Sequence, residues 1–233
     1  MKNLMIPALA LFLSAAAQAD DSPLWMRYCA ISPDGQTIAF SYQGDIYTVP
    51  SSGGKARQLT THPAHDTRPV WSPDGQRIAF ASNRSGNFDV FLMNKEGGEP
   101  KRLTTHSTNE YPTTFKDNGH ILYLANVLQD AKDIQFPGTR FMQVYEISTD
   151  GGRPDLYSSL YMENIALSKD GSKLLYNDYK GYEDPWRKHH QSSITRDIWL
   201  CTLGKDRSFQ KVTTFGGEDR NPVWAAHGAS FYY

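Results

Sequence analysis

The sequence predicts an all-β protein built from one repeated unit, and three observations support this prediction. The segment WSPDGQRIAF at 71–80 repeats ISPDGQTIAF at 31–40 almost letter for letter. Each copy contains short β-rich runs separated by turn signals. Turn glycines recur along the chain at Gly35, Gly75, Gly119, Gly171 and Gly228. Four strands per unit at a period of about forty residues or more are typical of the blades of a β-propeller.

The first element is an expected signal peptide over residues 1–19. Lys2 precedes an apolar run from Leu4 to Ala17, and the run ends in an Ala-x-Ala sequence at 17–19. A positive start, a short apolar stretch and a small-residue exit are typical of a cleaved secretory signal rather than of a membrane span. We therefore expect residues 20–233 to be exported to the periplasm or the outside of the cell, with no membrane span after cleavage.

Residues 20–233 are expected to form four complete blades and the first two strands of a fifth. Each unit has a turn of the SPDG kind, a β-rich run such as RIAFAS, an alternating strand such as DVFLM, and a final strand such as KRLTTH. Because the last letters, SFYY, stop inside a strand, we expect an N-terminal fragment whose ring is completed by later domains of the same polypeptide. The predicted blades cover about 24–60, 66–104, 110–159, 162–214 and 219–233.

The SPDG turn is predicted to be structural. Proline presets a turn φ, aspartate can accept a hydrogen bond from the backbone ahead of it, and glycine takes the positive φ that closes a tight hairpin. A calcium loop also uses aspartate and glycine, but its Asp-x-Asp-x-Asp-Gly spacing with a distant glutamate is absent from the sequence.

Composition excludes several classes of function. The chain has 24 Lys and Arg against 25 Asp and Glu, scattered along its length, which argues against nucleic acid as a partner. The sequence contains no Gly-x-Ser-x-Gly, His-Glu-x-x-His, phosphate-loop or Cys-x-x-Cys motif, so we expect no catalytic residue, metal or cofactor here. We favour Cys29 and Cys201 as two buried, unpaired residues on separate strands, with a disulfide as the alternative.

The connection between the second and third strand of each blade grows along the chain, and the fourth is the longest. Long irregular loops usually carry function, and aromatic and arginine side chains are common anchors of binding surfaces. The alternative is a loop packed on its own blade with its charges in solvent. The candidate residues for binding a peptide or a protein partner on this long-loop face are Tyr182, Trp186, Arg187, Lys188, His189, His190 and Arg196.

A second candidate site is a set of carboxylates near the start of each innermost strand. Asp66, Glu110 and Asp219 lie nine residues before their turn glycines, and Glu163 lies beside the corresponding Met162. These side chains could form a ring at the mouth of the central channel that attracts a peptide amino terminus or a cation. The alternative, which we favour, is that they accept hydrogen bonds from loop amides and fix the spacing of neighbouring blades.

The repeat also resembles known families. Pro-x-Trp-Ser-Pro-Asp-Gly, followed by Ile-Ala-Phe, by an Asp-Ile-Tyr-like strand, by Gly-Gly and by Leu-Thr, is similar to the WD-like repeats of TolB and of tricorn-type serine peptidases. The resemblance implies a non-catalytic propeller that gates or presents peptides to a distant hydrolytic domain of an exported tricorn-like peptidase. A TolB-like interaction protein without enzymatic activity is the alternative, and the propeller of a prolyl-oligopeptidase-like hydrolase is a weaker one.

Overall fold

The computed structural model describes residues 25–127, 142–181, 192–225 and 228–233, and these residues contain strands and turns but no helix. The strands form four antiparallel four-stranded sheets and one two-stranded sheet. In every sheet the strands pair in chain order. This arrangement confirms the predicted fold class, which is a β-propeller with four complete blades and the first two strands of a fifth.

In each of the first two blades, an SPDG turn joins the first strand to the second. The first blade contains β1 (Arg27–Ile31), β2 (Thr37–Tyr42), β3 (Asp45–Pro50) and β4 (Arg57–Gln58). The second blade contains β5 (Asp66–Trp71), β6 (Arg77–Ser82), β7 (Asp89–Asn94) and β8 (Gly97–Arg102).

The later blades repeat this order. The third blade contains β9 (Glu110–Asp117), β10 (His120–Ala125), β11 (Gln143–Ser148) and β12 (Asp155–Ser158). The fourth blade contains β13 (Glu163–Leu167), β14 (Lys173–Asn177), β15 (Ile198–Thr202) and β16 (Ser208–Lys211). The partial fifth blade contains β17 (Val223–Trp224) and β18 (Phe231–Tyr232).

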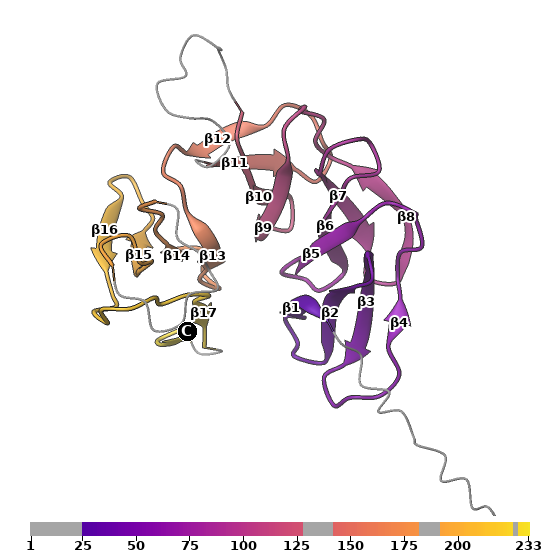
Figure 1. Cartoon of the computed structure of the whole chain (residues 1–233), viewed down its shortest axis with the longest axis horizontal. Coiled ribbons are helices and arrows are strands. Elements are labelled where there is room, and N and C mark those ends of the chain that lie inside the picture. Colours follow the sequence, from indigo (N-terminus) through magenta and orange to yellow (C-terminus); the bar gives the residue numbers. More distant parts are fainter. Residues whose placement is uncertain (1–24, 128–141, 182–191, 226–227) are drawn as a thin grey trace, which may run out of the picture.

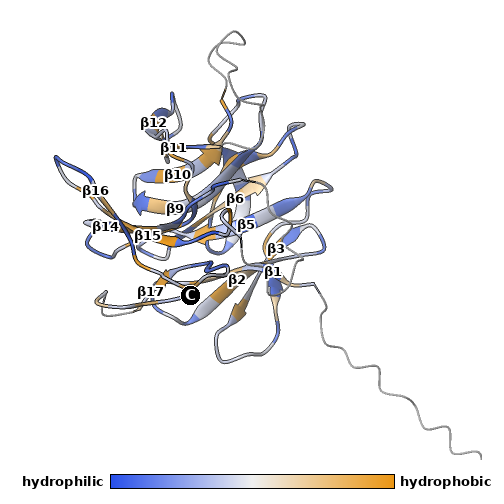
Figure 2. Ribbon diagram, turned by 60° about the vertical axis from the view of Figure 1, so that its left-hand side comes forward, coloured by the Kyte–Doolittle hydropathy of each residue, from blue (hydrophilic) through white to orange (hydrophobic). Residues whose placement is uncertain are grey.

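The blades are arranged around a central space as an incomplete ring, with β1, β5, β9, β13 and β17 as the inner strands (Figure 1). Hydrophobic residues concentrate in the strands, and the connecting loops are largely hydrophilic (Figure 2). Each apolar cluster is shared by two neighbouring blades. Phe80 of the second blade, for example, packs in one cluster with Ile46 of the first, and Val90 of the second blade packs in another with Tyr123 of the third. A blade therefore buries its faces only against its neighbours, as the repeat predicts.

The SPDG turns close through hydrogen bonds within the turn. In the second blade the Ser72 hydroxyl donates to Asp74 Oδ1 (2.5 Å), and the backbone N–H of Gln76 donates to the same oxygen (3.0 Å). Gly75 has a φ of +67°, in the left-handed region that glycine adopts without strain. The corresponding Gly119 is the exception to the expected turn, because it is not among the positive-φ residues and its N–H donates to Asp117 Oδ1 (2.7 Å).

Two tryptophans occupy equivalent places in the ring. Trp71 Nε1 of β5 donates to the Ala30 carbonyl of β1 (3.0 Å), and Trp224 Nε1 of β17 donates to the Ala166 carbonyl of β13 (2.9 Å). Each bond joins the inner strand of one blade to that of the preceding blade. The matching positions confirm that each sequence repeat is one radial blade.

The cysteine prediction was half wrong. Both thiols are unpaired and Cys201 is buried, as predicted, but Cys29 is exposed. The reason lies in its position on β1, the inner strand of the first blade, where Tyr28 and Ile31 are exposed as well. Among the described residues no preceding blade covers this strand, whereas Cys201 lies in a cluster shared by the third and fourth blades.

Candidate functional site

Three inner segments are tied to the preceding blade by a backbone N–H at or just before the start of the strand. The N–H of Asp66 donates to the Gly44 carbonyl (2.7 Å) and the N–H of Glu110 to the Phe88 carbonyl (2.7 Å). The N–H of Asp219 donates to the carbonyl of Arg196 in the same way (3.1 Å). The acceptors lie in or beside the loop between the second and third strands of the preceding blade. This loop and the connection that leads into the next inner strand therefore meet on one face of the propeller. The fold thus gathers the candidate carboxylates at one end of the inner strands.

Asp66 is fully buried and paired within its own blade. Arg84 Nη2 lies 3.0 Å from Oδ1 and 2.8 Å from Oδ2 of Asp66, and Arg84 Nε donates to the Ser82 hydroxyl (2.9 Å). The guanidinium also lies over the ring of Phe91, 4.8 Å from its centroid. A buried carboxylate with a charged partner on both oxygens is satisfied without a ligand.

Glu110 is also buried, with an exposure of 1%, but it lies beside a second carboxylate rather than a cation. The Thr104 hydroxyl and the His106 backbone N–H donate to it, and Asp89 of the preceding blade hydrogen-bonds to it. Because burial and the negative charge of Asp89 both disfavour ionisation, the pKa of Glu110 is raised to about 7. A hydrogen bond between two acids requires a proton, so Glu110 donates to Asp89. Asp89 also pairs with Arg102 (2.8 Å from Nη2 to Oδ2) and accepts from Asn87 Nδ2 (3.4 Å).

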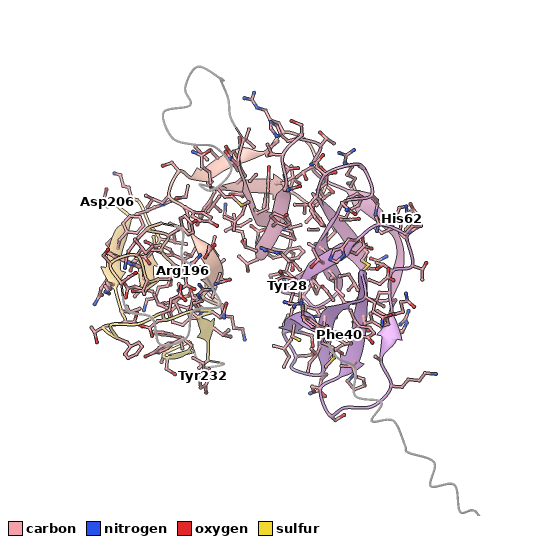
Figure 3. All side chains as sticks on the ribbon, viewed as in Figure 1. Tyr28, Phe40, His62, Arg196, Asp206 and Tyr232 are labelled. Carbon is pink, nitrogen blue, oxygen red and sulfur yellow. The ribbon has the colours of Figure 1, made fainter. Side chains whose placement is uncertain are left out.

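The structure brings together two residues that the sequence assigned to different sites. Arg196, from the long-loop set, and Glu163, from the carboxylate set, form an ion pair of 2.7 Å between Nε and Oε2. Arg196 Nη1 also donates to Glu218 Oε1 (2.9 Å), and Arg220 Nη2 donates to the same oxygen (2.5 Å). Arg196 lies in the fourth blade (Figure 3) and is buried. Burial alone would lower its pKa, but the charges and hydrogen bonds of Glu163 and Glu218 outweigh burial, and the pKa is raised. The network links the fourth blade to the connection that leads into the fifth.

The contacts of the carboxylates match the alternative interpretation only in part, because the Asp66 and Glu163 carboxylates pair with arginine side chains rather than with loop amides. Glu110 accepts from a loop amide, and the backbone of Asp66, Glu110 and Asp219 fixes the distance between blades. Asp219 Oδ2 and Glu110 Oε2 are both buried and accept no hydrogen bond from a donor among the described residues. Binding of a peptide terminus or a cation by this set stays a prediction. The described residues contain no group of three or more His, Cys, Asp or Glu side chains placed to hold a metal ion.

The other long-loop candidates lie outside the described residues. Their placement and contacts therefore do not enter the description of the site, and their role in binding stays a prediction. They are Tyr182, Trp186, Arg187, Lys188, His189 and His190.

The sequence interpretation missed a third group, which lies on the inner strands themselves. Four inner segments have a non-glycine residue in the left-handed region: Tyr28, Arg68, Asn164 and Asn221, with φ between 50° and 57°. All four lie seven residues before a turn glycine, so the alignment of repeats could have identified the position. In β1, β5 and β13 the strand register shifts at this residue, which identifies a β-bulge.

Comparison with known proteins assigns the family. Residues 23–233 match the family described as the tricorn protease N-terminal beta propeller domain. The chain belongs to this family. No helix in the described part of this tricorn-type propeller is long and apolar enough to cross a membrane.

Individual relatives cover shorter stretches. A TolB homologue of Chlorobium luteolum is 41% identical over 56 residues, which are 24% of this chain and 13% of the relative. Tricorn protease homolog 1 of Streptomyces coelicolor is 34% identical over 71 residues, or 30% of this chain and 6% of the relative. The matched part is thus a small fraction of each of these longer proteins.

Solved structures confirm the fold. The tricorn protease has a TM-score of 0.64 at 20% identity, covering 85% of this chain and 19% of the tricorn chain. TolB from Acinetobacter baumannii has a TM-score of 0.63 at 18% identity, covering 90% of this chain and 48% of that chain. At these identities the likeness concerns the propeller architecture alone.

Proposed function

We propose that this chain is the peptide-presenting propeller region of an exported tricorn-like serine peptidase, with hydrolysis carried out by a different part of the polypeptide. The family match over residues 23–233 is the observation that carries the proposal. The sequence adds a predicted signal peptide at 1–19 and no catalytic motif. In this function the propeller admits or orients peptides, and its inner strands contact them.

A TolB-like role is the second candidate. It is favoured by the identity of 41% over 56 residues with a TolB homologue and by the propeller architecture shared with TolB. In that role the long-loop face docks a protein partner and no peptide is cleaved. A prolyl-oligopeptidase-like hydrolase is a weaker candidate, supported by an identity of 46% over 52 residues with the Bacillus subtilis protein named as peptidase YuxL.

The two main candidates predict different contacts, which cross-linking can separate. The full-length protein, treated with a fluorophosphonate to block a reactive serine, is incubated with a photoreactive decapeptide and irradiated. Peptide presentation predicts cross-links on the inner strands, such as Asp66–Trp71 and Glu110–Asp117, rather than on the outer strand Gly97–Arg102. Untreated protein should hydrolyse the same peptide, and fluorophosphonate should abolish that hydrolysis. Absence of both hydrolysis and inner-strand cross-links would favour the TolB-like role.

Export is tested separately by amino-terminal sequencing of the protein from a cell fraction. Cleavage after Ala19 predicts a mature protein that starts at Asp20. Recovery of an intact Met1 from the cytoplasm would contradict the assignment of residues 1–19 as a secretory signal.

A further inference from the structure

Arg68 lies between two tyrosines that belong to the neighbouring blades. Its guanidinium carbon is 5.1 Å from the ring centroid of Tyr28 on β1 and 4.5 Å from that of Tyr111 on β9. Distances of this size are typical of cation–π contacts. Figure 3 shows Tyr28 at the inner edge of the blades, beside the central space. The inner strands of the first three blades therefore meet in one aromatic and basic cluster.

The guanidinium of Arg68 has no acceptor of its own within the described part of the chain, where no hydrogen bond or ion pair of this side chain occurs. The nearby acids are already engaged, because Asp66 is paired with Arg84 and Glu110 hydrogen-bonds to Asp89. Arg68 is only half-buried, so part of its side chain is exposed to solvent. Two rings thus hold a charged group in place while its five N–H donors stay free.

The backbone at this position makes arginine an unusual choice. Arg68 has a φ of 55°, and the equivalent residues of the fourth and fifth blades, with φ of 50° and 57°, are Asn164 and Asn221. Asparagine tolerates the left-handed region better than long side chains do. Residues in strained backbone positions gather at binding sites more than elsewhere. The bulge recurs in several blades, but among the described blades only the second has an arginine at this position between two tyrosines.

We propose that Arg68, held by Tyr28 and Tyr111, binds the carboxylate of an aspartate or glutamate side chain in a peptide lying along the inner strands. The planar guanidinium matches a carboxylate with two parallel hydrogen bonds. Arg68 is the third residue of six in β5, so a bound extended segment would continue past it in both directions. We therefore assign the carboxylate to a side chain rather than to a peptide terminus. The proposal rests on the proposed function in that it takes a peptide as the ligand.

The test compares three blocked peptides on the full-length protein by isothermal titration. They are Ac-Gly-Gly-Glu-Gly-Gly-NH2, its glutamine counterpart, and Ac-Gly-Gly-Gly-Gly-Gly with a free carboxyl terminus. We expect the glutamate peptide to bind at least about tenfold more tightly than the glutamine peptide, which is the range of a charge-assisted hydrogen-bond pair. Arg68→Gln should abolish this preference, and Arg68→Lys, which lacks the fork, should weaken it. Arg153→Gln, at an exposed arginine in the turn before β12, should leave it unchanged.

Each outcome decides the proposal. Equal binding of the glutamate and glutamine peptides would overturn the carboxylate site while leaving peptide presentation intact. Preference for the free carboxyl terminus alone would overturn the assignment to a side chain. Failure of all three peptides to bind, together with no inner-strand cross-links to the decapeptide, would overturn the proposed function itself. If Arg68→Gln does not fold, the Arg68→Lys variant still decides, because an unchanged preference there would contradict recognition by the guanidinium fork.

Discussion

Replacing Glu110 with glutamine should remove a pH dependence of stability that originates between the second and third blades. The pKa of Glu110 is raised from 4.5 to about 7 in the folded protein, mainly by burial. Below pH 4.5 the group is protonated in both the folded and the unfolded state, and its stabilising contribution is fully present. As the pH rises towards 7 the unfolded chain loses the proton first, so stability falls, and above 7 the fall is complete.

The size of the effect follows from the shift. A difference of one pKa unit corresponds to about 1.4 kcal/mol, so a shift from 4.5 to about 7 corresponds to about 3 kcal/mol of unfolding free energy. Glutamine is neutral at every pH, and its amide can donate to Asp89 as the protonated carboxyl does. We therefore expect Glu110→Gln to match the wild type near pH 4.5 and to be more stable than it by up to about 3 kcal/mol at pH 8.

The measurement is urea unfolding of the full-length protein and its variant at pH values from 4.5 to 8. Taking the difference between the two proteins at each pH cancels the titration of groups that do not interact with Glu110, so the remaining pH dependence belongs to Glu110 and the coupled Asp89. Glu99→Gln, at an exposed glutamate in β8, is the matched control and should parallel the wild type. A Glu110→Gln curve that keeps the wild-type slope would refute the argument, because Glu110 would then not carry the proton.

Three further changes test the ring itself. Trp71→Phe keeps the aromatic packing but removes the indole bond to the preceding blade, and it should cost about 1 kcal/mol of unfolding free energy by urea titration. Gly75→Ala should cost about 1–2 kcal/mol because of its φ of +67°, whereas Gly204→Ala, outside the left-handed region, should cost less than about 0.5 kcal/mol in the same assay. A thiol reagent should modify Cys29 in the native chain and reach Cys201 only after unfolding; native modification of both would contradict the burial of Cys201.

The sequence predicted the features that are local or periodic. Four strands per repeat and the turn at Asp74 follow from residues close in sequence or spaced by the repeat. These features need no knowledge of which loops meet in space. For the same reason the start of each inner strand could be located from its distance to the turn glycine.

The partners of the candidate residues could not be predicted in the same way. Glu163 and Arg196 are far apart in the chain and on different connections, and they meet only because those connections share a face of the propeller. The cluster around Arg68 needs three blades to be placed side by side. Exposure of Cys29 depends on what covers the first inner strand, which the repeat pattern does not state.

The repeat predicts the fold better than the function because the backbone makes the recurring bonds between blades, whereas the side chains at the same positions differ. Asp66, Glu110 and Asp219 make the same interblade bond through their backbone N–H groups, whatever their side chains contact. The bulge likewise recurs with tyrosine, arginine or asparagine on it. Because the main chain supplies the contacts that hold blades at their spacing, side chains at these positions can diverge without loss of the ring. Differences between equivalent positions, such as Arg68 against Asn164, are therefore where binding properties of a propeller are to be sought.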